Sequence, residues 1–224
     1  MCFEGFSAEG LAMLADLPNH DKQWFGEHKP LYTTLLLEPA KAFAAAMTDG
    51  LRDDVSPGIE GQPKVNGSIS PINNDLRFSP DKAPYKDHLM FKWWEGAQKK
   101  TAPTLWVRMS STDVGLATGT VLTPDGLERW RAAVDDETSG AVLASAVADL
   151  VGRCNAEVVG AELKRVPRPY DADHPRGDLL RHKWLQIRWL RPLPEEVRTA
   201  AFVDWCSDQL TAATDVHRWL VDHL

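Results

Sequence analysis

The chain has 224 residues, of which 43% are hydrophobic and 25% are charged, the composition of an ordinary globular protein. This excludes a disordered tail, a collagen-like chain and a disulfide-rich scaffold. Cys2, Cys154 and Cys206 are too few and too scattered for a disulfide framework or a thiolate zinc site. We therefore expect a single domain, residues 1–224.

The same sequence gives no sign of a membrane or of export. No stretch approaches 18 consecutive apolar residues, and the start Met1-Cys2-Phe3-Glu4 has neither a basic region nor an apolar run. We expect a soluble, cytoplasmic protein that has no membrane partner.

The formal net charge is −7, which argues against nonspecific binding to nucleic acid, so nucleic acid is not an expected partner. The charge is unevenly spread, because residues 64–108 and residues 160–191 each carry eight Lys and Arg against four Asp and Glu. If these two basic segments meet in space, they form one positive patch on an acidic body. That pattern favours a local site for an anion.

The first 55 residues are predicted to be helical. Ser7 is suited to cap a helix, with Phe6 and Leu11 at the spacing of a hydrophobic staple. A second helix is expected over 20–28 and an alanine-rich third over 39–53.

From Pro57 onward, glycine and proline divide the chain into short segments that are typical of strands. In the segment 103–111, Leu105 and Val107 point to one face while Trp106 and Arg108 point to the other. The segment 86–95 has apolar residues on both faces, which predicts a central strand covered on both sides. The strands expected in this region are 64–69, 75–79, 86–95, 103–111 and 114–121.

Helices and strands mix after residue 123. Thr123-Pro124-Asp125 is typical of a helix start, and this helix should run to about residue 135. The further elements expected are a helix over 138–153, a strand over 157–166, a short helix over 176–182, a strand over 183–191 and helices within 194–223. We predict an α+β fold with N-terminal helices, a central, mostly antiparallel sheet and C-terminal helices packed on that sheet. In outline, 1–55 is helical, 57–121 sheet-rich and 123–224 mixed.

The densest polar segment is 73–86. An arginine offers a planar fork for carboxylate or phosphate, and lysines add point charge, so this segment suits an anion. Asp75 and Asp81 are suited instead to a hard divalent cation, or they neutralise neighbouring basic residues in an ion-paired hairpin. The candidate ligand-binding residues here are Arg77, Lys82, Tyr85 and Lys86.

A second polar segment, 168–175, contains an Asp-x-Asp-His run. Asp171 and His174 are candidates to orient a ligand or to transfer protons. Asp173 is a candidate metal ligand, since carboxylate and imidazole groups suit metals. The alternative is that Asp173 caps the helix expected at 176–182.

Arg108 and Arg188 each lie within an apolar strand. A buried charge is costly unless it is paired, so each needs a partner or lines a cavity. Trp94, Trp106 and Gln186 can share that face. The arrangement would suit an anionic ligand that carries a flat group, and both arginines are candidate ligand-binding residues. The alternative is a permanent partner within the protein, such as Asp75 or Asp171.

Several blocks of the sequence resemble the DUF2461 family, a group of bacterial and fungal proteins without an assigned function. The clearest block, Asp75 to Lys86, is similar to the family signature R-D-x-R-F-S-x-D-K-x-P-Y-K. The opening helices, the segment from Gly115 to Arg131 and the block from Pro169 to Lys183 extend the likeness over nearly the whole chain.

The chain departs from the family pattern at two basic positions. Asn74 stands where the family has an arginine before the first aspartate, and a second arginine is replaced at or near Pro71. The resemblance implies that the two polar segments belong together, but it implies no reaction.

Three hypotheses follow, and they leave open whether the protein is an enzyme. The leading one is a cleft, lined by 75–86 and 168–183, that binds a small anionic ligand such as a phosphate compound. The second is a phosphoester hydrolase that depends on a divalent metal. The third is a non-enzymatic scaffold or partner-binding protein whose polar segments are internal ion pairs. The metal hypothesis requires one coordination sphere formed by Asp75, Asp81, Asp171 and His174.

Overall fold

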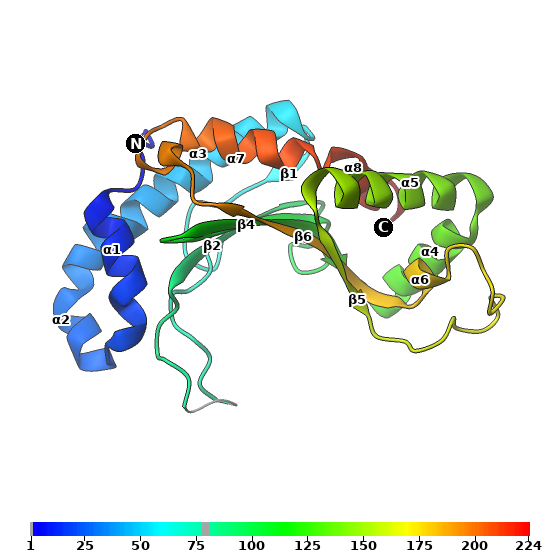
Figure 1. Ribbon diagram of the computed structural model, residues 1–224, viewed down its shortest axis with the longest axis horizontal. Coiled ribbons are helices and arrows are strands. Elements are labelled where there is room, and N and C mark those ends of the chain that lie inside the picture. The colour runs from blue at the N-terminus through cyan, green and yellow to red at the C-terminus, as the bar shows by residue number, and fades with distance from the viewer. Residues whose placement is uncertain (1, 78–80) are drawn as a thin grey trace.

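A computed structural model describes residues 2–77 and 81–224. Its centre is a six-stranded antiparallel sheet with the strand order β1-β2-β3-β4-β6-β5, flanked by helices from both ends of the chain, which confirms the α+β prediction (Figure 1). The strands are β1 (Ile59–Glu60), β2 (His88–Glu95), β3 (Thr104–Ser110), β4 (Asp113–Val121), β5 (Glu157–Ala161) and β6 (His182–Pro192).

The N-terminal helices follow the predicted order, but the second and third are continuous and not separated by a loop. The Ser7 hydroxyl accepts a hydrogen bond from the Gly10 amide at 3.0 Å, as expected of the cap of the first helix. The second helix runs past Pro30 and passes through a π-helical turn into the third. The elements are α1 (Ala8–Asp16), a 3-10 turn (Leu17–Asn19), α2 (Lys22–Tyr32), the π turn (Thr33–Leu37) and α3 (Glu38–Asp54).

The later helices also match the predicted regions. The Thr123 hydroxyl caps the fourth helix by accepting from the Gly126 amide at 3.1 Å. The tail predicted as helical within 194–223 contains a 3-10 turn and two helices. These elements are α4 (Pro124–Asp135), α5 (Glu137–Cys154), α6 (Gly177–Leu180), the 3-10 turn (Glu195–Arg198), α7 (Phe202–Thr211) and α8 (Thr214–His223).

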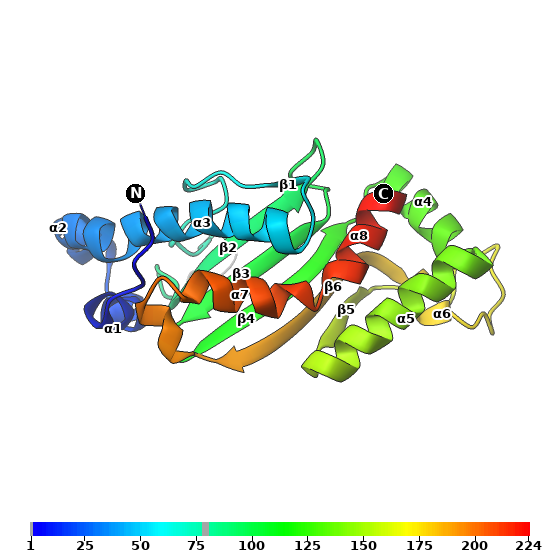
Figure 2. The same ribbon diagram turned by 90° about the horizontal axis from the view of Figure 1, so that it is seen from above.

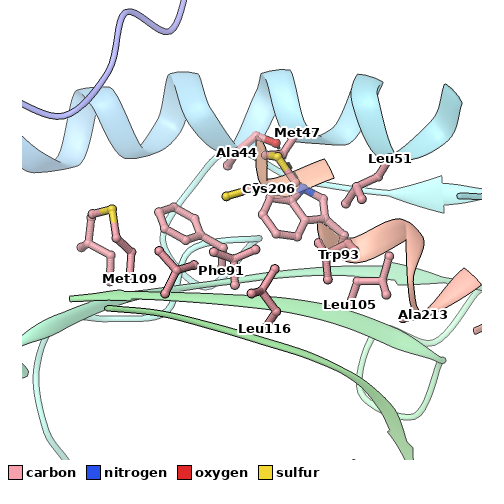
Figure 3. Packing of buried hydrophobic residues seen from close by; sticks show 14 of the residues in the cluster. Ala44, Met47, Leu51, Phe91, Trp93, Leu105, Met109, Leu116, Cys206 and Ala213 are labelled. Carbon is pink, nitrogen blue, oxygen red and sulfur yellow. Dashed lines mark hydrogen bonds between the residues drawn. The ribbon is translucent and has the colours of Figure 1, made fainter. Parts of the chain in front are cut away.

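The main core lies between the sheet and the pair α3 and α7. These two helices run side by side over one face of the sheet (Figure 2). Phe91, Trp93, Leu105 and Met109 point from the strands toward them (Figure 3) and are buried. The indole nitrogen of Trp93 donates to the Thr48 hydroxyl at 3.1 Å, so the only polar atom of this large buried side chain has a hydrogen-bond partner.

The opposite face of the sheet has no helix directly beneath it within the described residues (Figure 1). The prediction that 86–95 is covered on both sides is therefore wrong. On this face Met90 and Lys92 of β2 are only half-buried. Trp94 is buried, and the ammonium of Lys99, from the loop after β2, lies 5.0 Å from its ring. We call this side the uncovered face.

Two predicted strands differ in the structure. Residues 64–69 run beside β2 with isolated bridges only, such as Ile69 to Phe91. Within 75–79, residues 75–77 are not a strand, and 78 and 79 lie outside the described residues. Asn74 offers a physical reason, because its side-chain amide donates to the carbonyls of Ala83 and Tyr85 and so closes a loop. The strand predicted over 157–166 ends at Ala161.

The Trp93→Ala variant should lose about 3–5 kcal/mol of unfolding free energy, since it removes a large buried ring together with its hydrogen bond to Thr48. Urea titration followed by circular dichroism measures this loss. Val142→Ala, at an exposed position on α5, is the control and should stay within about 0.5 kcal/mol of the parent. A small loss in Trp93→Ala would contradict the core described above.

A buried histidine predicts how stability depends on pH. His217 of α8 is fully buried, and its Nε2 lies 3.0 Å from the Glu95 carboxylate. Burial lowers the pKa of His217 below the ordinary value of about 6.5. As the pH falls, the unfolded chain binds the proton first. The stability that neutral His217 contributes is therefore fully present above the unfolded pKa and is lost as the pH falls toward the folded pKa.

The parent protein should thus lose unfolding free energy between pH 7.5 and 5.5, by at most about 1.4 kcal/mol per pH unit for this proton. Urea titrations at both pH values measure the loss. The loss should be smaller in His217→Gln. An unchanged loss in that variant would assign the effect to other groups, such as His182, whose pKa burial also lowers.

Candidate functional site

The uncovered face presents one continuous row of side chains across five strands. Lys92, Trp106, Ala117, Arg188 and Glu157 lie directly opposite one another in adjacent strands. Because side chains alternate along a strand, all five point away from α3 and α7. The row therefore combines basic groups with an indole ring on a surface that the described helices leave open.

Small residues on β4 form the floor of this face. Gly115, Ala117 and Gly119 occupy every second position, so no large side chain stands in the middle of the sheet. Longer side chains of β3 and β6 flank this floor and enclose a hollow of about 630 Å³, the central hollow. Among the groups that line it are Trp106, Arg108, Gly115, Ala117, Gln186 and Arg188.

A second, smaller hollow of about 170 Å³ adjoins the central hollow on the same face. Trp106 and Gln186 line both hollows, so the two are neighbours across these side chains. Lysines of β2 and the following loop line the smaller one, which we call the lysine hollow. Its lining includes Lys92, Lys99, Lys100, Trp106, Trp184 and Gln186.

Both arginines of the central hollow have carboxylate partners. Arg188 donates from Nε and Nη2 to Glu157 Oε2 at 3.0 and 2.8 Å. Arg108 Nη1 lies 2.5 Å from Asp113 Oδ1, and its Nη2 lies 3.7 Å from Asp87. The partners thus come from neighbouring strands and strand ends, and not from the polar segments that the sequence suggested.

The two basic segments of the sequence contribute strands to the same sheet, separated by β4. Residues 64–108 supply β2 and β3, residues 160–191 supply β6, and β4 lies between them. Their basic side chains on the uncovered face include Lys92, Arg108 and Arg188, on either side of β4.

In the first polar segment, the structure pairs Asp75 with Arg77. Arg77 Nη2 lies 2.7 Å from Asp75 Oδ2, and this pairing lowers the pKa of the Asp75 carboxyl. The ring of Tyr85 is buried and stacks on Phe25 at 4.4 Å between centroids, and burial raises the pKa of its hydroxyl. The ammonium of Lys86 donates to the Pro71 carbonyl. Asp81 and Lys82 are both exposed.

The second polar segment forms turns and closes a helix end. Asp171 Oδ1 accepts from the Asp173 amide at 2.8 Å. His174 Nδ1 accepts from the Arg176 amide at 3.0 Å, which places the ring proton on Nε2, 3.3 Å from Asp135 Oδ1. The side chain of Asp173 does not cap α6, contrary to the alternative prediction, because α6 begins only after Arg176.

The side chain of Arg176 holds this segment to α4. Its Nε donates to the Val134 carbonyl at 2.6 Å and its Nη2 donates to the Asp135 carbonyl at 2.8 Å. These are carbonyls that the end of α4 leaves without an intrahelical partner. The second segment is therefore bound to the helical end of the molecule.

The two polar segments lie apart, with the sheet between them. Figures 1 and 2 place the loop of the first at the side of α2 and β2, and the second beside α4 and α6. Within the described ranges, no group of three or more His, Cys, Asp or Glu side chains could hold a metal ion. The geometry thus supports neither the shared cleft nor the metal sphere of Asp75, Asp81, Asp171 and His174.

Sequence reasoning named Trp106, Arg108, Gln186 and Arg188 as sharing a face, and the structure brings them together. It missed Lys92 and Lys99 as members of a site. A signal was present in β4, where Gly115, Ala117 and Gly119 recur with period two. Small residues on one face of a strand indicate close approach by another group.

Fold and site together define an α+β protein whose antiparallel sheet has one face packed on helices and one face left open with a basic, aromatic lining. Residues 10–219 match the sequence model of the family described as "Conserved hypothetical protein (DUF2461)", so the chain belongs to the DUF2461 family. No functionally curated protein matches the sequence. None of the described helices is both long and apolar enough to cross a membrane.

If the second segment is a structural clamp, Arg176→Met should cost about 1.5–3 kcal/mol of unfolding free energy, because it leaves carbonyls at the end of α4 unpaired. Urea titration measures the loss. Arg165→Met, at an exposed position of the same region, is the charge-matched control and should change little. Equal effects of the two substitutions would contradict the clamp.

Proposed function

We propose that the uncovered face binds a small ligand that joins a planar ring to an anionic group. The observation that carries this proposal is the row in which Trp106 and Arg188 stand on either side of Ala117. An indole offers a flat apolar surface, and a guanidinium offers a fork that matches carboxylate or phosphate. The central hollow, at about 630 Å³, has the size common for small-molecule sites.

The pairing of Arg188 leaves it able to bind a ligand. A guanidinium has five N–H donors, and the bonds to Glu157 come from Nε and Nη2 only. Both partners are exposed, and an exposed ion pair contributes little to stability. A ligand anion can therefore share Arg188 with Glu157 or replace it at small cost.

The floor of the hollow supports the placement of the ring. A Cβ at Gly115 would lie 3.6 Å from the Cβ of Arg108, an ordinary contact distance, so this position is not crowded. A planar ring can approach the backbone of β4 here while its edge contacts Trp106. Binding at an uncovered sheet face requires no reaction, and the proposal assigns none.

A second candidate function is the docking of a protein partner. Leu190 of β6 and Val121 of β4 are large apolar residues on the uncovered face and are 61% and 57% exposed. Exposed apolar side chains beside polar ones are common at protein interaction sites. We rank it second because the central hollow is concave and narrow.

We also propose that residues 1–224 form one domain. α3 from the N-terminal part and α7 from the C-terminal part pack on the same face of one sheet, and their buried residues belong to one continuous core. A division between them would split that core.

The proposal predicts binding of planar anions such as adenosine monophosphate and flavin mononucleotide, measured by isothermal titration calorimetry on the full chain. A bound probe at 100 times its Kd should raise the unfolding free energy by about 2.7 kcal/mol. Arg188→Met should weaken binding about 10-fold to 100-fold, because it removes a charge-assisted hydrogen-bond donor. Ala117→Leu should abolish binding by filling the hollow.

Arg165→Met is the matched control and should bind like the parent, since it removes the same charge away from the uncovered face. Urea titration of each variant shows whether it is folded. Absence of binding by every planar anion tested, or equal affinity in Arg188→Met and Arg165→Met, would overturn the proposal.

A further inference from the structure

Lys92 is half-buried, and no carboxylate among the described residues pairs with its ammonium group. It lies on β2, directly opposite Trp106, with its Nζ 5.4 Å from the centre of the Trp106 ring. Within the described residues its ammonium makes no hydrogen bond to another group and no ion pair. Burial lowers the pKa of this lysine. A partly desolvated charge without a partner costs stability, which a bound anion would offset.

Lys99 adds a second charge in a fixed position. Its ammonium donates to the carbonyls of Gly67, at 2.6 Å, and Asn66, and it lies 5.0 Å from the Trp94 ring. These contacts hold the side chain in place without neutralising its charge. The pKa of Lys99 is lowered by its burial and by the nearby charges of Lys92 and Lys64.

The lysines therefore form a cluster of like charge, Lys64, Lys92, Lys99 and Lys100. None of the four has a carboxylate partner among residues 2–77 and 81–224. Arg108 and Arg188, on the same face, both have one. Trp184, which lines the lysine hollow, donates from its indole to the Glu162 carboxylate, and that carboxylate also pairs with Lys183.

The row places its two charged ends on opposite sides of Trp106. Lys92 and Arg188 are three strand spacings apart, which is roughly 14 Å between their backbones. Trp106 stands between them and lines both hollows. The lysine hollow, at about 170 Å³, suits a compact anion, while the central hollow has room for a ring.

We infer that the lysine hollow is a second, phosphate-binding subsite, and that the ligand of the uncovered face is a ring-bearing compound with two or more linked phosphates, such as a nucleoside diphosphate. The ring and the first phosphate lie in the central hollow beside Trp106 and Arg188, and the added phosphate lies toward Lys92 and Lys99. This inference rests on the proposed function and adds the class of ligand.

The test compares adenosine diphosphate with adenosine monophosphate by calorimetry on the full chain at one fixed salt concentration. Adenosine diphosphate should bind at least about 10-fold tighter, as one added charge-assisted contact predicts. Lys92→Met should remove that advantage and leave the affinity for the monophosphate within about twofold. Lys29→Met, an exposed lysine on α2, is the matched control and should change neither affinity.

Stability provides a second readout. Because Lys92→Met removes a partly buried, unpaired charge, its urea midpoint should equal or exceed that of the parent, so lost affinity would not reflect lost folding. A lower midpoint together with unchanged affinity for adenosine diphosphate would show that Lys92 serves the fold and would overturn the inference.

Other outcomes separate the inference from the function on which it rests. Equal affinities for the two nucleotides, with Arg188→Met still weakening both, would overturn the phosphate subsite and keep the proposed function. Binding of inorganic triphosphate alone, with no nucleotide bound, would overturn both. If a single-stranded oligonucleotide binds more tightly than adenosine diphosphate and its binding depends on Lys92, the nucleoside diphosphate would be wrong as the ligand class. A polynucleotide would then be the ligand.

Discussion

The burial of one face of the sheet under α3 and α7 is the constraint on which the other features depend. Leu105 and Met109 of β3 must point toward these helices to be removed from water, and Trp106 and Arg108 must then point the opposite way. A shift of one residue in register would move polar groups into the core. The hydrophobic packing of one face thus fixes, residue by residue, which side chains the other face presents.

The uncovered face carries charges of two kinds, and they differ in what they contribute. Arg108 and Arg188 are held by Asp113 and Glu157, so their orientation is set before any ligand arrives. Lys92 has no such partner within the described chain and retains an uncompensated charge beside an aromatic ring. The arginines are thus oriented donors, whereas the charge of Lys92 is not neutralised and costs stability. Features that cost stability are often found at functional sites.

Much of the fold could be predicted from the sequence, because period-two alternation in 103–111 and the caps Ser7 and Thr123 are local signals. The site could be predicted only in part. Arg108 and Arg188 were singled out by the cost of burying charge, but Arg188 is exposed in the structure, so that premise was wrong for it. The partners of both arginines depend on strand order, which no local pattern encodes. The polar segments misled for a related reason. Their residues are dense in sequence, yet much of that polarity is used in turns and in holding the end of α4, as with Arg176. Lys92 was hidden because a lysine within an apolar strand does not reveal which groups surround it.

The two glycines in the floor of the central hollow differ in whether a side chain could be added to them. A Cβ at Gly119 would lie 2.0 Å from the backbone oxygen of Leu185, so any side chain there would push β4 and β6 apart. At Gly115 the nearest atoms would be 3.6 to 3.9 Å away, an ordinary contact distance. A substitution at Gly115 would therefore narrow the central hollow without disturbing the sheet, whereas the Gly119 end is fixed by the strand pairing. Under the proposed function, the width of the hollow could be varied at Gly115 while the fold is retained.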